Sequence, residues 1–206
     1  VVVHQATVRT SGVGRILEAA EGCFGERGYA RASMADIAKS AGVAKSLLHY
    51  HFDTKATMFL AVQMRTLESM LLDAKRATYE SGEGRVRLRS VLNRVFDDLR
   101  RDPKKARVLL ELHTWEEGSR ARQLEVFNRR AKELIVIGIQ ELAGDETRRD
   151  EGALERIADM TLLLFKGVLV ELCSTREQDS AVRTREAFDN IVVLLEQALL
   201  APHAAE

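Results

Sequence analysis

Helical periodicity over most of its length is the feature that most constrains the fold of this chain. From residue 56 onward, apolar residues recur at spacings of three and four, and no stretch of useful length alternates as a strand would. The 206 residues include only two prolines, and one of them, Pro103, suits the first turn of a helix. The sequence therefore predicts an all-α protein of about nine helices, long enough to bury a core.

The periodic segments give approximate helix bounds. Beyond the first 55 residues, helices are expected over 56–71, 86–99, 103–117, 121–142, 151–174 and 181–201. The segment 79–84 is a loop by composition. Residues 134–139 are apolar almost all round, which predicts a helix buried on most sides.

Residues 33–55 contain two short helices joined by a tight turn. Ser33 precedes Asp36 by three residues, a spacing that lets the Ser hydroxyl accept from the free amides of a first helical turn. Gly42 can adopt the left-handed conformation that ends a helix, while Leu48 and Phe52 face inward together. The residues left facing outward are Ala44, Lys45, Ser46, His49 and Tyr50. This layout is that of a helix-turn-helix, whose second helix enters the major groove of DNA.

The flanking residues extend this pattern. An apolar stripe (Ile16, Leu17, Ala20, Cys23, Phe24) leads to Gly28, which is expected to stop the first helix. With these flanks the chain resembles the TetR (tetracycline-repressor) family of transcriptional regulators. The matching residues cover about a quarter of the chain, in order and without a gap, and are Ile16-Leu17, Ala19-Ala20, Phe24, Gly28-Tyr29, Ser33-Met34, Asp36-Ile37-Ala38, Ala41-Gly42-Val43, Lys45, Leu48, Tyr50-His51-Phe52 and Lys55.

The resemblance implies roles for individual residues of the head. The groove-facing residues it implies are Lys45, Ser46, His49 and Tyr50, and the phosphate-positioning ones are Ser33, Tyr50, His51 and Lys55. Lys55 begins a fourth helix that Asp53 or Thr54 can cap. On this basis Lys55→Ala should weaken binding to all DNA and flatten the salt dependence, whereas Lys45→Ala should relax a preference for guanine.

Three positions depart from the family pattern. Ala44 stands where Ser or Thr is usual, Leu47 where Thr is common, and His49 where Tyr is usual. The lost hydroxyls remove possible hydrogen bonds to phosphates or bases. We therefore expect the choice of operator, rather than the fold, to differ from that of relatives.

The last two predicted helices carry apolar residues on more than one face. One face can pack on the body while the other requires a partner, which favours a two-fold four-helix interface between two copies of the chain. The candidate interface residues are Leu164, Val168, Leu172, Phe188, Ile191 and Leu195. The resemblance implies the same homodimer, and two heads would bind a pseudo-palindromic operator in double-stranded DNA. A thick monomeric core is the alternative.

A ligand cavity in the middle helices is implied by the resemblance alone. Its candidate lining residues are Phe96, Leu99, Leu110, His113, Trp115, Phe127, Ile135 and Ile139. Walls of this kind would suit a small lipophilic or aromatic effector that releases a repressor from its operator by a population shift. Each of these residues can equally be ordinary core.

Composition bounds the remaining possibilities. The net charge of the whole chain is zero. Residues 1–55 hold seven Lys and Arg against five Asp and Glu, so the remaining residues hold 24 Lys and Arg against 26 Asp and Glu. Cys23 and Cys173 stand in apolar contexts and are expected to be buried free thiols. The sequence lacks a secretory signal and an apolar stretch long enough to span a bilayer, so we expect a cytoplasmic protein without a membrane partner.

Other function classes find less support in the sequence. We expect no enzyme, because no nucleophile context, phosphate loop or metal-ligand cluster is found, and His49 and His51 lack the further ligands of a metal site. No cofactor is predicted. A protein-interaction module that has lost DNA binding is the remaining alternative. The expected organisation is an arm (1–12), a helix-turn-helix domain (13–55), a ligand-binding and dimerisation domain (56–202) and a tail (203–206).

Overall fold

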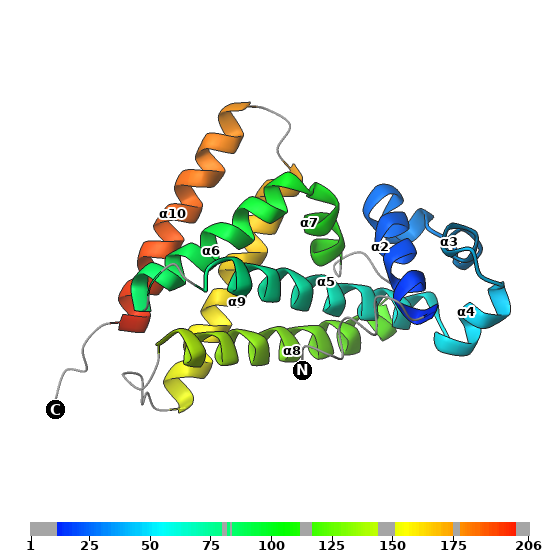
Figure 1. Cartoon of the computed structure of the whole chain (residues 1–206), viewed down its shortest axis with the longest axis horizontal. Helices are drawn as coiled ribbons and strands as arrows, with labels where there is room; N and C mark the ends of the chain where they lie inside the picture. Colours follow the sequence, from blue (N-terminus) through cyan, green and yellow to red (C-terminus); the bar gives the residue numbers. More distant parts are fainter. Residues whose placement is uncertain are drawn as a thin grey trace.

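Helices account for almost all of the residues that the structure describes, which are 12–79, 82, 84–111, 117–143, 151–174 and 178–200. The structure is a computed structural model. Within these ranges it contains nine helices and no strand, which confirms the predicted all-α fold (Figure 1). The helices are α2 (Gly12–Arg31), α3 (Met34–Ala41), α4 (Lys45–His51), α5 (Lys55–Ala77), α6 (Gly84–Arg101), α7 (Pro103–Leu110), α8 (Glu117–Ala143), α9 (Glu151–Ser174) and α10 (Gln178–Leu200).

Helices α2, α3 and α4 form a head around the start of α5, at the right of Figure 1. Its core is aromatic: the Phe24 and Phe59 rings meet edge to face with centroids 4.7 Å apart, and Tyr29 lies 5.2 Å from Phe59. Leu48 is the only residue of α4 that is fully buried. Full burial of one such side chain stabilises by roughly 2 kcal/mol, so tertiary packing rather than propensity holds this seven-residue helix.

The body comprises the rest of α5 together with α6 to α10. Helix α9 passes behind α5 and α6 in Figure 1 and contacts α7, α8 and α10, while α10 packs along α6. The main body cluster joins Met70 of α5, Leu99 of α6, Phe127 of α8 and Leu169 of α9. No helix in the described ranges combines the length and hydropathy needed to cross a bilayer.

Two predictions about the body differ from the structure. Helix α7 ends at Leu110 with Glu111 as its C-cap, earlier than the expected 117, and α8 begins at Glu117, earlier than the expected 121. On α8, Ile137 is 45% exposed although the apolar run around it predicted burial on most sides. The helix is covered by α5 and α9 but leaves this face uncovered within one chain.

Candidate nucleic-acid interface

The turn between α3 and α4 is fixed by hydrogen bonds at both ends of α3. The Ser33 hydroxyl accepts from Asp36 N at 3.1 Å, which confirms the predicted N-cap. Gly42 has φ +65° and its amide donates to the Lys39 carbonyl, while Val43 N donates to Ala38 O at 3.0 Å. These bonds satisfy carbonyls at the helix end and define the angle at which α4 leaves the turn.

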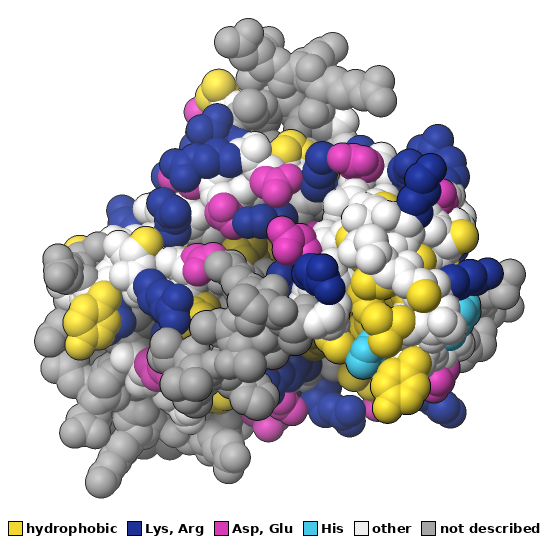
Figure 2. Space-filling view, turned by 45° about the vertical axis from the view of Figure 1, so that its right-hand side comes forward, with side chains coloured by type: hydrophobic (Ala, Val, Ile, Leu, Met, Phe, Trp, Pro, Cys, Tyr) yellow, Lys and Arg dark blue, Asp and Glu magenta, His cyan; other side chains and the backbone are white. Residues whose placement is uncertain are grey.

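Helix α4 presents a polar outer face. Leu48 is buried beneath it and Phe52 is partly buried, as predicted, whereas the five predicted DNA-contacting residues of α4 are exposed: Lys45, Ser46, His49, Tyr50 and His51. The Tyr50 side chain is 81% exposed, with its ring 5.1 Å from that of His51. Figure 2 shows histidine and hydrophobic side chains side by side on this part of the head, among lysines and arginines. Donors and one aromatic ring therefore share one accessible surface.

Ala44 is the N-cap of α4 and makes no side-chain capping bond. Its place at the cap explains why Ser or Thr would be favourable there. Helix α5 is capped instead by Thr54, which forms a reciprocal capping box with Thr57, and this decides between the two predicted candidates Asp53 and Thr54.

Two predicted phosphate contacts are engaged within the head. The Ser33 hydroxyl also donates to Asp36 Oδ2 at 2.6 Å, and this bond is the first cause that lowers the pKa of the Asp36 carboxyl. The Lys55 ammonium donates to the carbonyl oxygens of Tyr29 at 2.9 Å and Ala32 at 3.1 Å, and it lies 4.3 Å from the centre of the Tyr29 ring. The Lys55 charge therefore binds the carboxyl end of α2, and its contact with a DNA phosphate stays a prediction.

Head and body are joined by a contact between the end of α2 and α7 that the sequence did not predict. Gly28 interrupts α2 with φ +77° and ψ 163°, and the amide of Tyr29 donates to Glu111 Oε1 at 2.6 Å. A Cβ on Gly28 would stand 2.7 Å from that same oxygen. Arg107 of α7 adds a bond from Nη1 to the Gly25 carbonyl at 3.2 Å. Gly28 was expected only to stop a helix, and nothing in the sequence links it to a residue 83 positions away.

Burial raises the pKa of the Glu111 carboxyl above its ordinary value of 4.5. The hydrogen bond from Tyr29 and the charges of Arg107, Lys55 and Arg31 oppose this effect without cancelling it. The carboxylate is therefore partly desolvated where α7 meets the end of α2.

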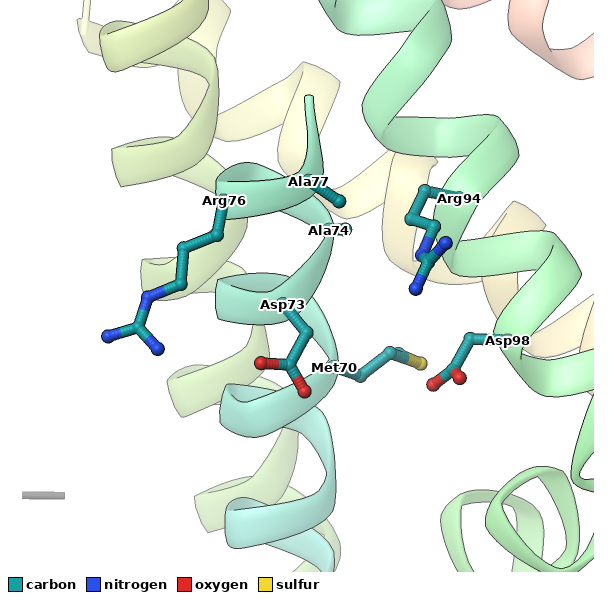
Figure 3. A pocket seen from close by; sticks show the side chains of 7 residues that line it. All are labelled: Met70, Asp73, Ala74, Arg76, Ala77, Arg94 and Asp98. Atoms are coloured by element: carbon teal, nitrogen blue, oxygen red, sulfur yellow. The ribbon is translucent and has the colours of Figure 1, made fainter. Parts of the chain in front are cut away.

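Six of the eight predicted effector-binding residues lie in the described part of the body, and all six are buried or half-buried. Phe96, Leu99, Phe127 and Ile139 are buried, and Leu110 and Ile135 are half-buried. The Phe96 ring stacks on Phe188 with centroids 4.4 Å apart, while His113 and Trp115 lie outside the described residues. Two surface hollows are found elsewhere, one between α5 and α6 (Figure 3) and one between α2 and α3, and neither is lined by these eight residues.

The predicted dimer residues divide into two groups. Val168, Phe188 and Leu195 are buried in the core of the chain itself, where Phe188 packs on Phe96, so the prediction that they form an outer face is wrong. Leu164, Leu172 and Ile191 are half-buried. Among the side chains of α9 and α10 that the structure describes, the large apolar ones that are exposed are Met160, Leu163, Val170, Val182, Val193 and Leu194.

The two cysteines also differ from each other. Cys23 is buried as predicted, whereas Cys173 is exposed, so the expectation of two buried thiols is half wrong. Partial burial raises the pKa of the Cys173 thiol. Within the described ranges, no group of three or more His, Cys, Asp and Glu is arranged to hold a metal ion.

Comparison with known proteins agrees with the resemblance inferred from the sequence. Residues 16–62 match the family described as bacterial regulatory proteins of the tetR family. The transcriptional activator FasR of Mycolicibacterium smegmatis is 31% identical over 136 residues, which cover 66% of this chain and 62% of FasR. The transcriptional regulator TtgR of Pseudomonas putida is 34% identical over 109 residues, 48% of each chain. The chain thus spans between about half and three fifths of these relatives.

A solved structure gives the same fold over a greater length. The transcriptional regulator FadR from Bacillus subtilis, in complex with stearoyl-CoA, superposes with a TM-score of 0.60 at 18% identity, covering 92% of this chain and 98% of FadR. These proteins are transcriptional regulators by name, which agrees with the prediction of a regulator rather than an enzyme.

Proposed function

We propose that this chain, which belongs to the TetR family of bacterial regulatory proteins, binds a pseudo-palindromic DNA operator as a homodimer and is controlled by a small-molecule effector. The observation that carries the proposal is the exposed outer face of α4, held by buried Leu48 and the capped turn at Gly42. Lys45, Ser46, His49 and Tyr50 are the proposed base-reading residues. Tyr50 and His51 are the proposed phosphate contacts.

The proposed dimer rests on an apolar face that one chain leaves uncovered. Met160, Leu163, Gly167 and Val170 recur at spacings of three and four along α9, and Leu163 is 68% exposed. Leu194 of α10 is 54% exposed. Apolar side chains gathered on two adjacent helices favour a two-fold four-helix interface, in which Gly167 would allow a close approach of the partner. Two heads related in this way would match two half-sites.

An effector of lipophilic character is supported by the relatives. FadR from Bacillus subtilis is described in complex with stearoyl-CoA, an apolar chain on an anionic head. We propose that the effector binds the DNA-incompetent state better and so releases the operator. FasR is named an activator, so a reporter gene under the operator is the readout that assigns repression or activation to this chain.

The DNA-binding role is tested by mobility shift with the DNA upstream of the chain's own gene at several salt concentrations. Lys45→Ala should weaken specific binding and relax the preference at one base pair by about 1–3 kcal/mol. Lys39→Ala is the matched control, because Lys39 is exposed on α3 and borders the hollow between α2 and α3. Equal losses for the two variants, or no salt-dependent specific binding by the wild type, would contradict the proposal.

The dimer is tested by sedimentation. Leu163→Glu should convert the chain into a folded monomer with weakened operator binding, since a charge would enter the apolar interface. Ile137→Glu is the control, because Ile137 is an exposed apolar residue on α8 rather than on α9 or α10. A wild type that sediments as a monomer at micromolar concentration would refute the dimer.

A further inference from the structure

The outer face of α4 has two flanks of different chemistry. Leu48 is fully buried, and an α-helix turns by about 100° per residue, so Leu47 and His49 lie at equal angles on either side of the line that faces outward. Ser46 and Tyr50 lie along that line. His49 carries two ring nitrogens, whereas Leu47 carries no group that can donate or accept a hydrogen bond.

Leu47 marks an apolar flank of this face. Its side chain is 39% exposed, and it borders the ring of Tyr50, which is 81% exposed. Ala44, also exposed, lies about one turn earlier on the same side. Figure 2 shows hydrophobic side chains beside histidine on this part of the head. The donors Lys45 and His49 share the opposite flank, so the seven-residue helix separates apolar from polar groups across its accessible surface.

Both flanks would lie close to base edges in the major groove of DNA. The groove is about 12 Å wide, and an α-helix with its side chains measures about 10–12 Å across. Among the four bases only thymine presents an apolar group there, its C5 methyl. Beside guanine, adenine or cytosine, the Leu47 side chain would remove water from a donor or acceptor and offer no hydrogen bond in return. A leucine at this place therefore favours thymine and disfavours the other three bases.

We propose that Leu47 reads the C5 methyl group of a thymine in each operator half-site. This assignment rests on the proposed DNA-binding function and deepens it. Lys45 and His49 face hydrogen-bonding groups on one side of the groove, and Leu47 packs on a methyl group on the other side. Relative to the Thr that is common at this position, Leu47 thus replaces a hydrogen bond with an apolar contact instead of only losing it.

Removal of the methyl group tests the proposal. An operator is first selected from random DNA with the full-length wild type, and each thymine is then replaced in turn, in both half-sites, by deoxyuridine, which lacks the methyl and keeps the base pairing. Binding is measured by mobility shift at one salt concentration. At one thymine, replacement should weaken wild-type binding about fourfold per half-site and so about fifteenfold in both, as expected for one buried methyl group.

Variants of Leu47 assign this methyl contact to its side chain. Leu47→Ala should bind the operator more weakly, and its difference between thymine and deoxyuridine at that position should fall below about twofold per half-site, because the apolar surface that covers the methyl is removed. Leu47→Met keeps an apolar side chain of similar size and should keep the difference. Tyr50→Ala is the matched control, because Tyr50 is the other large exposed apolar side chain of α4, and it should also keep the difference at that thymine.

Three results would overturn the proposal while leaving DNA binding intact. The wild type could bind deoxyuridine and thymine operators alike at every position. A Leu47→Ala protein with wild-type Tm could keep the full difference at every thymine. The difference could also be lost in Tyr50→Ala instead of Leu47→Ala. Failure of the wild type to select any operator would contradict the DNA-binding function itself, and this proposal with it.

Discussion

Replacing Gly28 with alanine tests the joint between head and body most directly. Gly28 has φ +77° and ψ 163°, a region that residues with a Cβ rarely enter, and its missing side chain lets Glu111 reach the Tyr29 amide. Alanine would therefore face two problems: a strained backbone, and a Cβ 2.7 Å from Glu111 Oε1. The carboxylate would have to move, and its bond to Tyr29 would be lost.

The magnitude follows from these two contributions. The backbone conformation costs about 1–3 kcal/mol for a residue other than glycine. Losing a hydrogen bond between a half-buried carboxylate and an amide costs about 1–2 kcal/mol more. We expect Gly28→Ala to lower the free energy of unfolding by about 2–5 kcal/mol, which for a chain of this size is roughly 4–20 °C in Tm.

Thermal unfolding followed by circular dichroism, at one fixed protein concentration, measures this loss. Gly42→Ala is the matched control, because Gly42 has φ +65° but a Cβ there would have no atom within 4 Å. It should lose only about 1–2 kcal/mol. In the Glu111→Ala background, Gly28→Ala should lower the free energy of unfolding by less, since the carboxylate that the new Cβ would meet is absent. A Gly28→Ala protein as stable as Gly42→Ala would refute the reasoning.

Three further predictions concern single side chains. Lys55→Met should lower Tm by a few degrees without DNA, because two carbonyl oxygens lose their donor; unchanged melting would favour the original phosphate role for Lys55. The raised pKa of Glu111 stabilises the fold fully below about pH 4.5, and this contribution is lost as pH rises through the raised value. The Tm of Glu111→Gln minus the Tm of the wild type should therefore increase as pH rises from 4.5 to 7. A Tm difference that does not change with pH would contradict this. The Cys173 thiol is exposed and should be the one thiol per native chain that reacts with a disulfide reagent, although its raised pKa should make it slower than an ordinary exposed thiol. Cys173→Ser should abolish this reaction, and reaction of both thiols at the same rate would contradict the burial of Cys23.

Local rules made the head predictable from sequence. The cap at Ser33, the left-handed Gly42 and the inward Leu48 each depend on neighbours within a few positions, and the structure has all three. The helical fold of the body was predictable for the same reason, since periodicity is a local signal. The family resemblance added the roles toward DNA that are proposed for the outward residues on α4.

Long-range contacts were not predictable in this way. Val168 of α9 and Phe188 and Leu195 of α10 were expected to face a second copy of the chain, but periodicity cannot tell whether a partner helix belongs to the same chain or to another copy. The contacts of Lys55 within the head were missed, because the carbonyl oxygens that bind it come from the end of α2, more than 20 positions earlier. The hollow between α5 and α6 depends on how these two helices pack, and that too is decided by tertiary contacts.

Helix α5 runs without interruption from the head to the hollow, and its length makes it a lever. Its 23 residues span about 33 Å at 1.5 Å per residue. A tilt of about 5° at the Ala77 end would displace the Lys55 end by about 3 Å, close to the rise of one base pair. In a two-fold pair both heads would move, and the distance between them could change by about 6 Å, against the roughly 34 Å between successive major grooves. A movement smaller than one helical turn of α5 would thus put two half-sites out of register.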